Sequence, residues 1–395
     1  MQLARIKKYY QNIKNKKKLY LWYIIIYNRM KKVLFETHHL YYWPNFLPII
    51  EELKRRGNYK IYVSMPKRNS DVEKNILSEI CLQMEISFIF LENEQARIKK
   101  IIDQKYDIII VGNVGQLNKI VSKNTITVMV YHGIGLKKSY YNDIDKRIDI
   151  RAVESDARFN ELKNHGHENL ELIGFTKLDR LFTINNKYLE NLKIEMGLDA
   201  HKKNILYAPS FYPTSLERLY AHLPEISIDF NLIIKLHAFS WEQQKYYYQH
   251  SLCSKLSKEN ENIFLLSNSI YDIIPYYLLS DLLITDISST MFEYLPLNKP
   301  IIQAECYSLK FKHRILQRRF WRKMDLDRHQ EIDFVYNIKD PGNLVNRVYF
   351  AIENIDDMAL KRKSACEYYL YKSDGMASSR LIDSIENYNN ENSNI

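Results

Sequence analysis

The strongest constraint on the fold of this chain of 395 residues is an alternation of short apolar runs with amphipathic segments, which begins near residue 33. The amphipathic segments, such as Phe46 to Arg56 and Asp71 to Met84, have helical periodicity. Strands that alternate with helices are typical of a parallel sheet covered by helices on both faces. In this first half the expected strands are VLFET (33–37), KIYVS (60–64), SFIFL (87–91), DIIIVG (107–112) and TITVMVYH (125–132).

The alternation stops at a polar stretch near residues 185–203 and then restarts. Because a single core rarely grows beyond about 250 to 300 residues, we expect an α/β fold with two Rossmann-like domains facing a central cleft. The second set of expected strands is NILYA (204–208), NLIIKLH (231–237), IFLL (263–266), DLLIT (281–285) and KPIIQ (299–303). The predicted division is a basic arm (1–32), an N-terminal domain (33–190), a C-terminal domain (201–372) and a closing helix with a frayed tail (373–395).

The net charge of +10 is confined to the arm. Residues 1–32 hold ten of the 57 Lys and Arg and none of the 47 Asp and Glu, so the rest of the chain is formally neutral. A neutral body argues against a nucleic-acid groove, and makes a non-enzymatic membrane-surface or nucleic-acid binding protein the weakest interpretation.

The chain has four widely spaced cysteines: Cys81, Cys253, Cys306 and Cys366. Their spacing indicates neither a zinc site nor a disulfide framework, which favours a protein of the reducing cytoplasm.

Within the arm, the run LYLWYIIIY (19–27) is apolar and aromatic and has lysines on both sides. Its nine residues are too few to span a bilayer, which takes about 20. Trp and Tyr favour the headgroup level and basic residues favour an anionic leaflet, so one interpretation is a peripheral anchor on the inner face of the cytoplasmic membrane. The other is a terminus whose apolar segment packs on the body. Liposome sedimentation after deletion of residues 1–30 distinguishes the two.

Residues that follow the strands are the candidates for chemistry, because ligands of parallel sheets bind beyond the carboxyl ends of the strands. The first such place is the segment YHGIGLK (131–137), where a strand ends directly in His132 and Gly133 follows. A neutral imidazole there is suited to accept a proton from an incoming hydroxyl group. A structural histidine at a strand end is the alternative, and these residues alone favour it.

The second place is the end of the run NLIIKLH. Side chains alternate along a strand, so Lys235 and His237 share a face and are placed to meet a diphosphate together. The alternative is an ordinary solvated lysine beside an unrelated histidine.

The third place is the segment from Thr285 to Glu293, in which Asp286, Ser288 and Ser289 follow a strand and precede a helix. With only 10 glycines in the chain, a glycine-rich phosphate loop is not expected, but serine hydroxyls and free N–H groups at a helix start also hold phosphate. Thr290 and Glu293 have the spacing of a capping box, and the residues alone favour that structural interpretation.

The fourth place is GFTKLD (174–179), which by itself indicates a turn and a helix start. In order, YHGIGLK, GFTKLD, ILYAP (205–209), KLHAF (235–239) and ITDISSTMFEY (284–294) resemble the motifs of the CDP-glycerol glycerophosphotransferase family, the teichoic-acid and capsule polymerases and primases. The resemblance covers roughly residues 125–385. The chain departs from the family pattern where Tyr131 replaces Trp, Thr176-Lys177 replaces Pro-Arg and Ala238 replaces Pro.

This resemblance implies a GT-B fold that binds CDP-glycerol between its domains and transfers glycerol phosphate to a hydroxyl of a glycan or lipid-linked acceptor, with release of CMP. It implies that His132 is the base, that His237 and Lys235 steady the diphosphate, and that Ser288 and Ser289 bind its oxygens. It extends substrate binding to Gly133, Lys137, Lys177, Asp179, Asp286 and Glu293, and it requires no metal or cofactor.

Two alternatives share the expected architecture. A GT-B glycosyltransferase would use a nucleotide sugar for capsule or surface polysaccharide, and a sugar-nucleotide epimerase is more distant. The sequence leaves glycerol against ribitol phosphate, priming against polymerisation, and the oligomeric state open.

Overall fold

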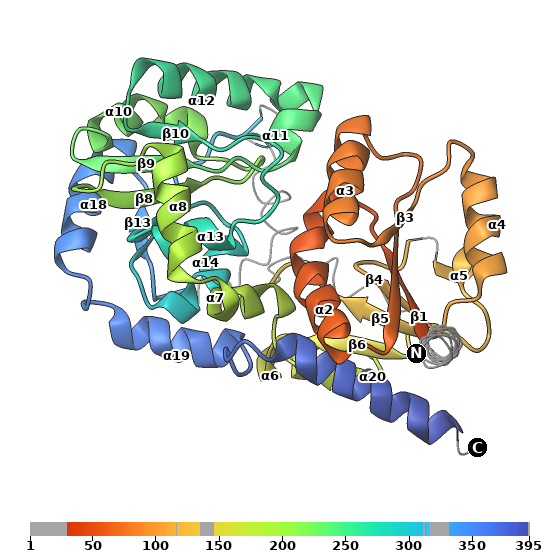
Figure 1. Ribbon diagram of the computed structural model, residues 1–395. Coiled ribbons are helices and arrows are strands. Elements are labelled where there is room, and N and C mark those ends of the chain that lie inside the picture. The colour runs from red at the N-terminus through yellow and green to blue at the C-terminus, as the bar shows by residue number, and fades with distance from the viewer. Residues whose placement is uncertain are drawn as a thin grey trace, which may run out of the picture.

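The computed structural model describes residues 30–115, 117–134, 146–310, 313, 315 and 332–393. These form two domains, each built on a parallel sheet, that lie side by side and are joined along one edge by the C-terminal helices (Figure 1). Almost the whole basic arm lies outside the described residues, and so does Lys137. The two-domain α/β architecture expected from the alternation of strands and helices is confirmed.

The first domain has a seven-stranded sheet in the order β3-β2-β1-β4-β5-β6-β7. The order reverses between β1 and β4, which is the point where such sheets open a binding crevice. Every pairing in this sheet is parallel. The strands are β1 (Lys31–Glu36), β2 (Tyr59–Ser64), β3 (Ser87–Ile89), β4 (Ile108–Val111), β5 (Ile126–Val130), β6 (Ile150–Val153) and β7 (Leu170–Leu172).

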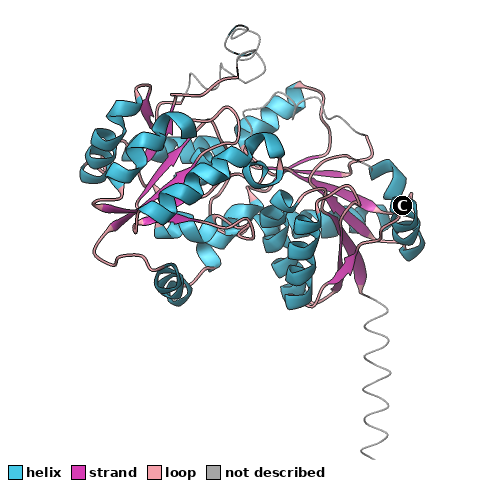
Figure 2. Ribbon diagram, turned by 90° about the horizontal axis from the view of Figure 1, so that it is seen from above, coloured by secondary structure: helices cyan, strands magenta, loops and turns pink. Residues whose placement is uncertain are grey.

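Helices cover both faces of this sheet, as the view from above shows (Figure 2). The helix that leads toward the cleft, α2 (Trp43–Arg56), has a proline in its first turn and ends at Gly57, whose φ of +76° favours glycine. Ser70 caps the next helix by accepting from the Glu73 N–H. The other elements are η1 (Leu40–Tyr42), α3 (Asp71–Gln83), α4 (Glu94–Gln104), α5 (Leu117–Ile120) and α6 (Asp156–Asn164).

The second domain has a six-stranded parallel sheet in the order β10-β9-β8-β11-β12-β13, which reverses between β8 and β11. Three of its inner strands, β9, β11 and β12, are buried along their whole length, in keeping with their nearly continuous apolar sequences. The strands are β8 (Lys203–Ala208), β9 (Phe230–Ile234), β10 (Ile263–Leu265), β11 (Leu282–Thr285), β12 (Ile301–Ala304) and β13 (Tyr336–Ile338).

The polar stretch expected to separate the halves is mostly helical, because α8 (Asn186–Met196) occupies it, with Asn185 as its cap and Gly197 at its end. The helices of the second half are otherwise short near the cleft and longer on the outside. They are η3 (Thr176–Asp179), α7 (Arg180–Thr183), α9 (Leu216–Leu219), η4 (Tyr220–His222), α10 (Leu223–Ile226), α11 (Phe239–Glu242), η5 (Gln244–Tyr246), α12 (Tyr247–Glu259), α13 (Ile274–Leu279), α14 (Thr290–Glu293), η6 (Leu295–Leu297), η7 (Pro341–Asn343), α18 (Leu344–Glu353), α19 (Ala359–Tyr369) and α20 (Ala377–Ser393).

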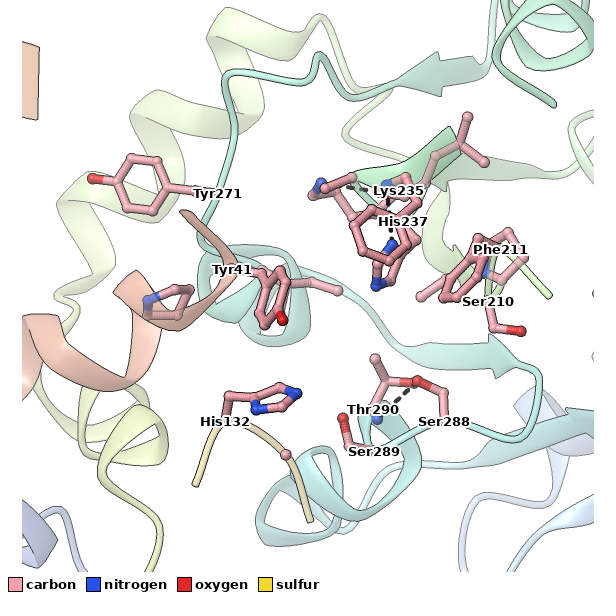
Figure 3. Close-up of a pocket in the computed structure, with 18 of the residues that line it drawn as sticks. Tyr41, His132, Ser210, Phe211, Lys235, His237, Tyr271, Ser288, Ser289 and Thr290 are labelled. Atoms are coloured by element: carbon pink, nitrogen blue, oxygen red, sulfur yellow. Dashed lines mark hydrogen bonds between the residues drawn. The ribbon is translucent and has the colours of Figure 1, made fainter. Parts of the chain in front are cut away.

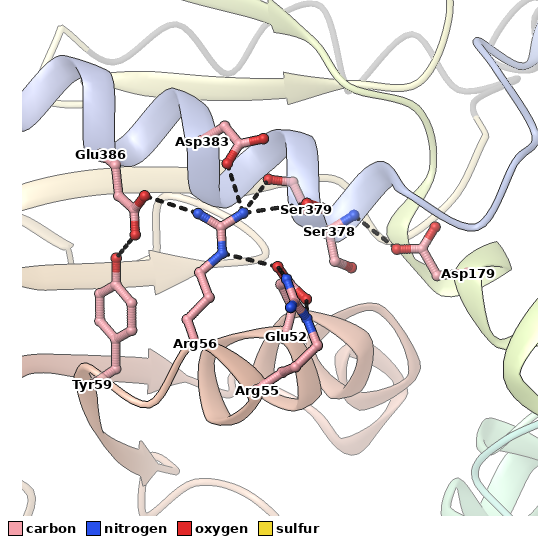
Figure 4. Close-up of polar contacts among 9 residues, drawn as sticks. All are labelled: Glu52, Arg55, Arg56, Tyr59, Asp179, Ser378, Ser379, Asp383 and Glu386. Carbon is pink, nitrogen blue, oxygen red and sulfur yellow. Dashed lines mark hydrogen bonds and ion pairs between the residues drawn. The ribbon is translucent and has the colours of Figure 1, made fainter.

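The chain ends by crossing back from the second domain to the first, where α20 packs beside α2 (Figure 1). Leu381 and Ile382 of α20 belong to the same apolar cluster as Phe46 of α2. Polar contacts reinforce this packing (Figure 4): the Arg56 guanidinium lies 2.6 Å from an Asp383 oxygen and 2.9 Å from a Glu386 oxygen. The C-terminal helix is therefore a structural part of the first domain.

The tail differs from the fraying expected beyond Tyr388, because α20 continues to Ser393. The Tyr388 hydroxyl donates a hydrogen bond of 3.2 Å to Asp149 of the first domain, which fixes this end of the helix. No helix among the described residues is long and apolar enough to cross a membrane.

Gly174 begins the segment that connects the two domains, and its backbone conformation requires glycine. Its φ is +96°, and an added Cβ would lie 2.7 Å from the Tyr371 carbonyl oxygen. The close approach brings η3 against the start of α20 and fixes where the residues after Gly174 enter the cleft.

Candidate functional site

A cavity of about 380 Å³ lies between the two domains, where the carboxyl ends of their strands face each other (Figure 3). The first domain contributes η1, the residues after β5 and Lys177. The second contributes the residues after β8, β9, β10 and β11. Eight of the expected site residues line this cavity although they are far apart in sequence: His132, Gly133, Lys177, Lys235, His237, Ser288, Ser289 and Glu293.

His132 stands in the wall formed by the first domain, two residues after the end of β5. Its ring lies 5.0 Å from the Tyr41 ring and 4.8 Å from the Tyr42 ring, centroid to centroid. The Asn45 amide donates to the Tyr131 carbonyl at 3.2 Å and thereby ties the strand end to α2. The imidazole is thus held by packing at the cavity surface, which is the placement a general base needs.

His237 stands in the opposite wall, after β9. Its Nδ1 accepts a hydrogen bond from the Phe239 N–H at 3.1 Å, so in the neutral ring the proton is on Nε2. Rings on both sides restrain it, with centroids 4.7 Å away for Phe211 and 4.9 Å for Phe239. An oriented N–H donor in a cavity wall is suited to a phosphate oxygen.

Lys235 follows β9 directly and lines the same wall. Its ammonium group donates to the Leu236 carbonyl at 3.2 Å. Burial, together with the charge of Lys177, lowers the pKa of Lys235 to about 8. An incoming anion would offset both effects, because it favours the charged form of the amine.

Ser288 and Ser289 lie at the turn between β11 and α14, in the lower right of Figure 3. The capping box that the residues alone favoured is not formed. Thr290 is the first helical residue, and its hydroxyl pairs with the Thr285 hydroxyl at 2.7 Å. Because α14 is a single turn, its dipole is small, and the serine hydroxyls are the groups of this segment that can meet a phosphate.

Glu293 is buried to 1% exposure and forms an ion pair with Lys177 across the cleft, with 2.6 Å between Nζ and Oε2. The Tyr277 hydroxyl donates to the same carboxylate at 3.0 Å and the Ser289 hydroxyl at 3.1 Å. Burial and the neighbouring Glu293 raise the pKa of Tyr277, so its hydroxyl stays protonated as a donor. Glu293 therefore organises the site through its neighbours and joins the two domains.

Asp286 lies beneath the cavity wall and is fully buried. Its carboxylate accepts hydrogen bonds from the Ser210 N–H at 2.9 Å and the Ser215 N–H at 3.2 Å. Burial raises its pKa to about 7, although these hydrogen bonds oppose the shift. Asp286 holds the loop after β8 in place, and Ser210 of that loop lines the cavity.

Asp179 is the expected substrate-binding residue that the structure places away from the cavity. Its carboxylate accepts from the N–H groups of Ala377 at 3.0 Å and Ser378 at 2.7 Å, which are the first residues of α20 (Figure 4). The side chain thus caps the C-terminal helix. Lys137 lies outside the described residues, so the structure does not place it.

Several residues of the cavity wall were not anticipated from the sequence, among them Tyr41, Phe211, Glu242 and Tyr271. Tyr41 follows β1, and the Phe239 ring meets it edge to face at 6.4 Å across the cleft. Glu242 ends the short helix α11. Each of these follows a strand end by several residues, and only the position after the strand marked them in the sequence.

Among the described residues, no group of three or more His, Cys, Asp or Glu side chains is placed to hold a metal ion. The cavity thus combines an imidazole on one side with an imidazole, an ammonium group and two hydroxyls on the other. This arrangement can position a diphosphate against one wall and a hydroxyl nucleophile against the other.

The amino-acid sequence is similar to a protein family and to curated relatives. The family described as CDP-glycerol:poly(glycerophosphate) glycerophosphotransferase matches residues 22–387. The teichoic acid poly(ribitol-phosphate) polymerase of Bacillus spizizenii is 26% identical over 305 residues, which are 67% of this chain and 44% of the relative. The teichoic acid poly(glycerol phosphate) polymerase of the same organism is 24% identical over 282 residues, 64% of this chain and 67% of the relative. The chain thus spans less than half the length of the first relative.

Among solved structures, the wall teichoic acid polymerase TagF superposes with a TM-score of 0.66 at 18% identity, and the match covers 92% of this chain and 91% of that one. At this identity the likeness establishes the fold alone, which is the GT-B arrangement of two Rossmann-like domains.

Proposed function

The chain belongs to the CDP-glycerol:poly(glycerophosphate) glycerophosphotransferase family, and on that premise we propose that it transfers glycerol phosphate, or a related alditol phosphate, from a CDP-activated donor to a hydroxyl group of a cell-surface glycan or lipid-linked acceptor. One observation carries the proposal: His132 and the group of Lys235, His237, Ser288 and Ser289 line opposite walls of one cavity. A base and a diphosphate site that face each other are what such a transfer needs.

The donor occupies the wall of the second domain. The diphosphate of CDP-glycerol carries negative charge, which the Lys235 ammonium neutralises while the His237 Nε2–H and the serine hydroxyls donate to its oxygens. The glycerol phosphate end then points toward His132. Phosphoryl transfer depends mainly on such positioning and charge stabilisation.

The acceptor hydroxyl approaches from the wall of the first domain. His132 takes the proton of the acceptor hydroxyl while the oxygen of that hydroxyl forms a bond to the phosphorus that bears glycerol. The bond from this phosphorus to the oxygen bridging to the CMP phosphate breaks, and CMP leaves with the bonding electron pair. The proton ends on His132 and the negative charge on CMP, so the step balances without any other reactant.

The experiment that tests this proposal separates donor binding from turnover. Thermal unfolding is measured with CDP-glycerol, CDP-ribitol, CMP-sialic acid and UDP-sugars, each in large excess. We expect stabilisation by CDP-alditols, about 2.7 kcal/mol at 100 times the dissociation constant. Stabilisation by nucleotide sugars alone would contradict the proposal and favour the glycosyltransferase alternative.

Turnover is then measured as CMP release from CDP-glycerol with an alkyl disaccharide as acceptor. His132→Ala is expected to lower the rate by about 10²- to 10⁴-fold and to leave donor stabilisation intact. His165→Ala, at an exposed helix end, is the matched control. A His132→Ala variant with most of the wild-type rate would overturn the role of His132 as base.

The acceptor class, the membrane association of the basic arm and the place at the inner face of the cytoplasmic membrane stay predictions. Lys137 and nearly all of the arm lie outside the described residues, so the role of Lys137 rests on the resemblance of the sequence and that of the arm on its basic and aromatic residues.

A further inference from the structure

The cavity has two ends of different chemistry. The donor wall carries Lys235, His237 and the serines. The other end is formed by η1 of the first domain with α11 and the residues after β10, and Glu242 belongs to it. Among the described residues, the cavity wall contains two carboxylates, Glu242 and Glu293. Glu293 is neutralised by its ion pair with Lys177. Glu242 forms no ion pair with any described Lys or Arg.

The position of Glu242 relative to His132 follows from a chain of aromatic contacts. Phe239 precedes Glu242 by three residues and therefore lies on the same side of α11. The Phe239 ring meets Tyr41 of the first domain edge to face at 6.4 Å, and the Tyr41 ring lies 5.0 Å from the His132 ring. Tyr41 thus stands between the candidate base His132 and α11. Figure 3 shows the Tyr41 ring above His132.

The surroundings of Glu242 disfavour a second anion. Burial raises the pKa of Glu242 to about 7, and Glu73 of the first domain adds to this effect, while His39 and a hydrogen bond from Asn268 oppose it. Glu73 is itself buried and lies 3.5 Å from His39. A phosphate at this end would meet the charge of Glu73 and, where Glu242 is ionised, a second negative charge. A hydroxyl group, in contrast, would donate a hydrogen bond to Glu242 and stabilise it.

Aromatic and apolar surface accompanies this carboxylate. Tyr41, Tyr271 and Phe239 line the same cavity as Glu242 and Asn268. A carboxylate and an amide beside aromatic faces form hydrogen bonds to hydroxyl groups and pack against their carbon skeleton. The residues just named include no Lys or Arg that could form a charge-assisted hydrogen bond with a phosphodiester.

We propose that this end of the cavity is the acceptor subsite, in which Glu242 accepts a hydrogen bond from a hydroxyl of an uncharged sugar, so that the acceptor is a glycan end without phosphate. The inference rests on the proposed function and narrows it. The attacking hydroxyl reaches His132 while another hydroxyl of the same glycan end binds Glu242 and the Tyr41 ring packs against the glycan. The enzyme then adds a first unit to a glycan instead of extending a phosphate-bearing chain.

The test compares two probes that differ in one group. The first is an alkyl disaccharide with free hydroxyls, and the second is the same disaccharide carrying one glycerol phosphate. Binding of each to the full chain is measured by calorimetry, with and without saturating CMP. We expect the uncharged probe to bind at least tenfold more tightly. Equal binding, tighter binding of the phosphorylated probe, or no binding of either would overturn the inference.

The variant Glu242→Gln removes the charge and keeps the shape. It is expected to weaken binding of the uncharged probe about fivefold and to strengthen binding of the phosphorylated probe, so that the two affinities converge. Glu259→Gln, at an exposed position on α12, is the matched control and should change neither affinity. A Glu242→Gln protein that keeps the wild-type ratio would overturn the role of Glu242.

The failure of this inference differs from the failure of the proposed function. If CDP-alditols stabilise the protein and His132→Ala abolishes turnover while the phosphorylated probe binds better, the transferase stands and the acceptor assignment falls. If no CDP-alditol binds but the uncharged probe does, with Glu242 dependence, the subsite stands and the assigned reaction falls.

Discussion

Lys177 of the first domain and Glu293 of the second form an ion pair of 2.6 Å, with the lysine side chain 11% exposed and the glutamate 1%. The lysine precedes α7 and the glutamate ends α14, so the pair joins elements that are 116 residues apart in sequence, and both residues line the cavity. It fixes the separation of the two walls and holds a cation beside Lys235 without leaving its charge uncompensated.

The variant Lys177→Met removes one partner and leaves a buried carboxylate. We expect a loss of about 2 to 4 kcal/mol in the free energy of unfolding, moderated by the two hydroxyls that still donate to Glu293. The double variant Lys177→Met with Glu293→Gln should regain part of this loss. Denaturant unfolding followed by tryptophan fluorescence checks both. The surface pair of Lys193 and Glu190 serves as control, since Lys193→Met should cost less than about 1 kcal/mol.

Asp179 provides a prediction that separates structure from substrate binding. Because it accepts from two N–H groups at the start of α20, Asp179→Ala should destabilise the protein by about 1 to 2 kcal/mol and speed amide exchange in α20. Asp179→Ser, which keeps one acceptor, should recover part of the stability. Stabilisation by CDP-glycerol should stay at the wild-type value in both variants. Its loss would show that Asp179 binds substrate, as the resemblance of the sequence implied.

Asp286 links the pH dependence of stability to the loop after β8. Its pKa of about 7 exceeds the usual value near 4, so between about pH 4 and 7 the folded chain holds a proton that the unfolded chain has released. Its contribution to the free energy of unfolding is therefore full below about pH 4 and is lost as the pH rises through 7. Asp286→Asn should flatten this part of the profile of melting temperature against pH.

The same variant should weaken binding of CDP-glycerol several-fold, because an amide offers one acceptor where the carboxylate offers two to Ser210 and Ser215. The exposed Asp103, replaced by Asn, is the control and should leave profile and affinity unchanged. A variant whose profile keeps the wild-type slope would show that Asp286 is ionised throughout.

Most strands of both sheets could be predicted from the sequence, because strands that are buried on both faces consist of continuous apolar runs. Three strands were missed: β6 (Ile150–Val153), β7 (Leu170–Leu172) and β13 (Tyr336–Ile338). The first contains Arg151, which is buried although charged, and the other two are three-residue edge strands with Glu171 or Asn337 at the centre. None of them shows the uninterrupted apolar pattern by which the others were recognised.

For the candidate site as well, some residues could be predicted from the sequence and others could not. Strand ends converge by topology, so His132 and His237 were recognisable from their positions in the sequence. The partners of a side chain depend on tertiary contacts. The sequence therefore gave no indication that Asp179 caps a helix about 200 residues later or that Glu242 faces the first domain.

Lys235 supplies a prediction about donor affinity. Burial and the charge of Lys177 lower its pKa to about 8, while a bound diphosphate favours the ammonium form. Below pH 8 the free protein already carries the charge that the donor needs. Above pH 8 the amine is mostly neutral, so each binding event must take up a proton from solution.

The dissociation constant of CDP-glycerol should therefore be constant below about pH 8 and rise above it by about tenfold per pH unit until the pKa of the bound state is reached. Calorimetry at pH 7, 8 and 9 in buffers of different ionisation enthalpy measures both the affinity and the proton uptake. Lys235→Gln should bind weakly at every pH and show no uptake, whereas Lys203→Gln, an exposed control at the start of β8, should follow the wild type. An affinity that stays constant to pH 9 in the wild type, or a slope that survives in Lys235→Gln, would exclude Lys235 as the cation that meets the diphosphate.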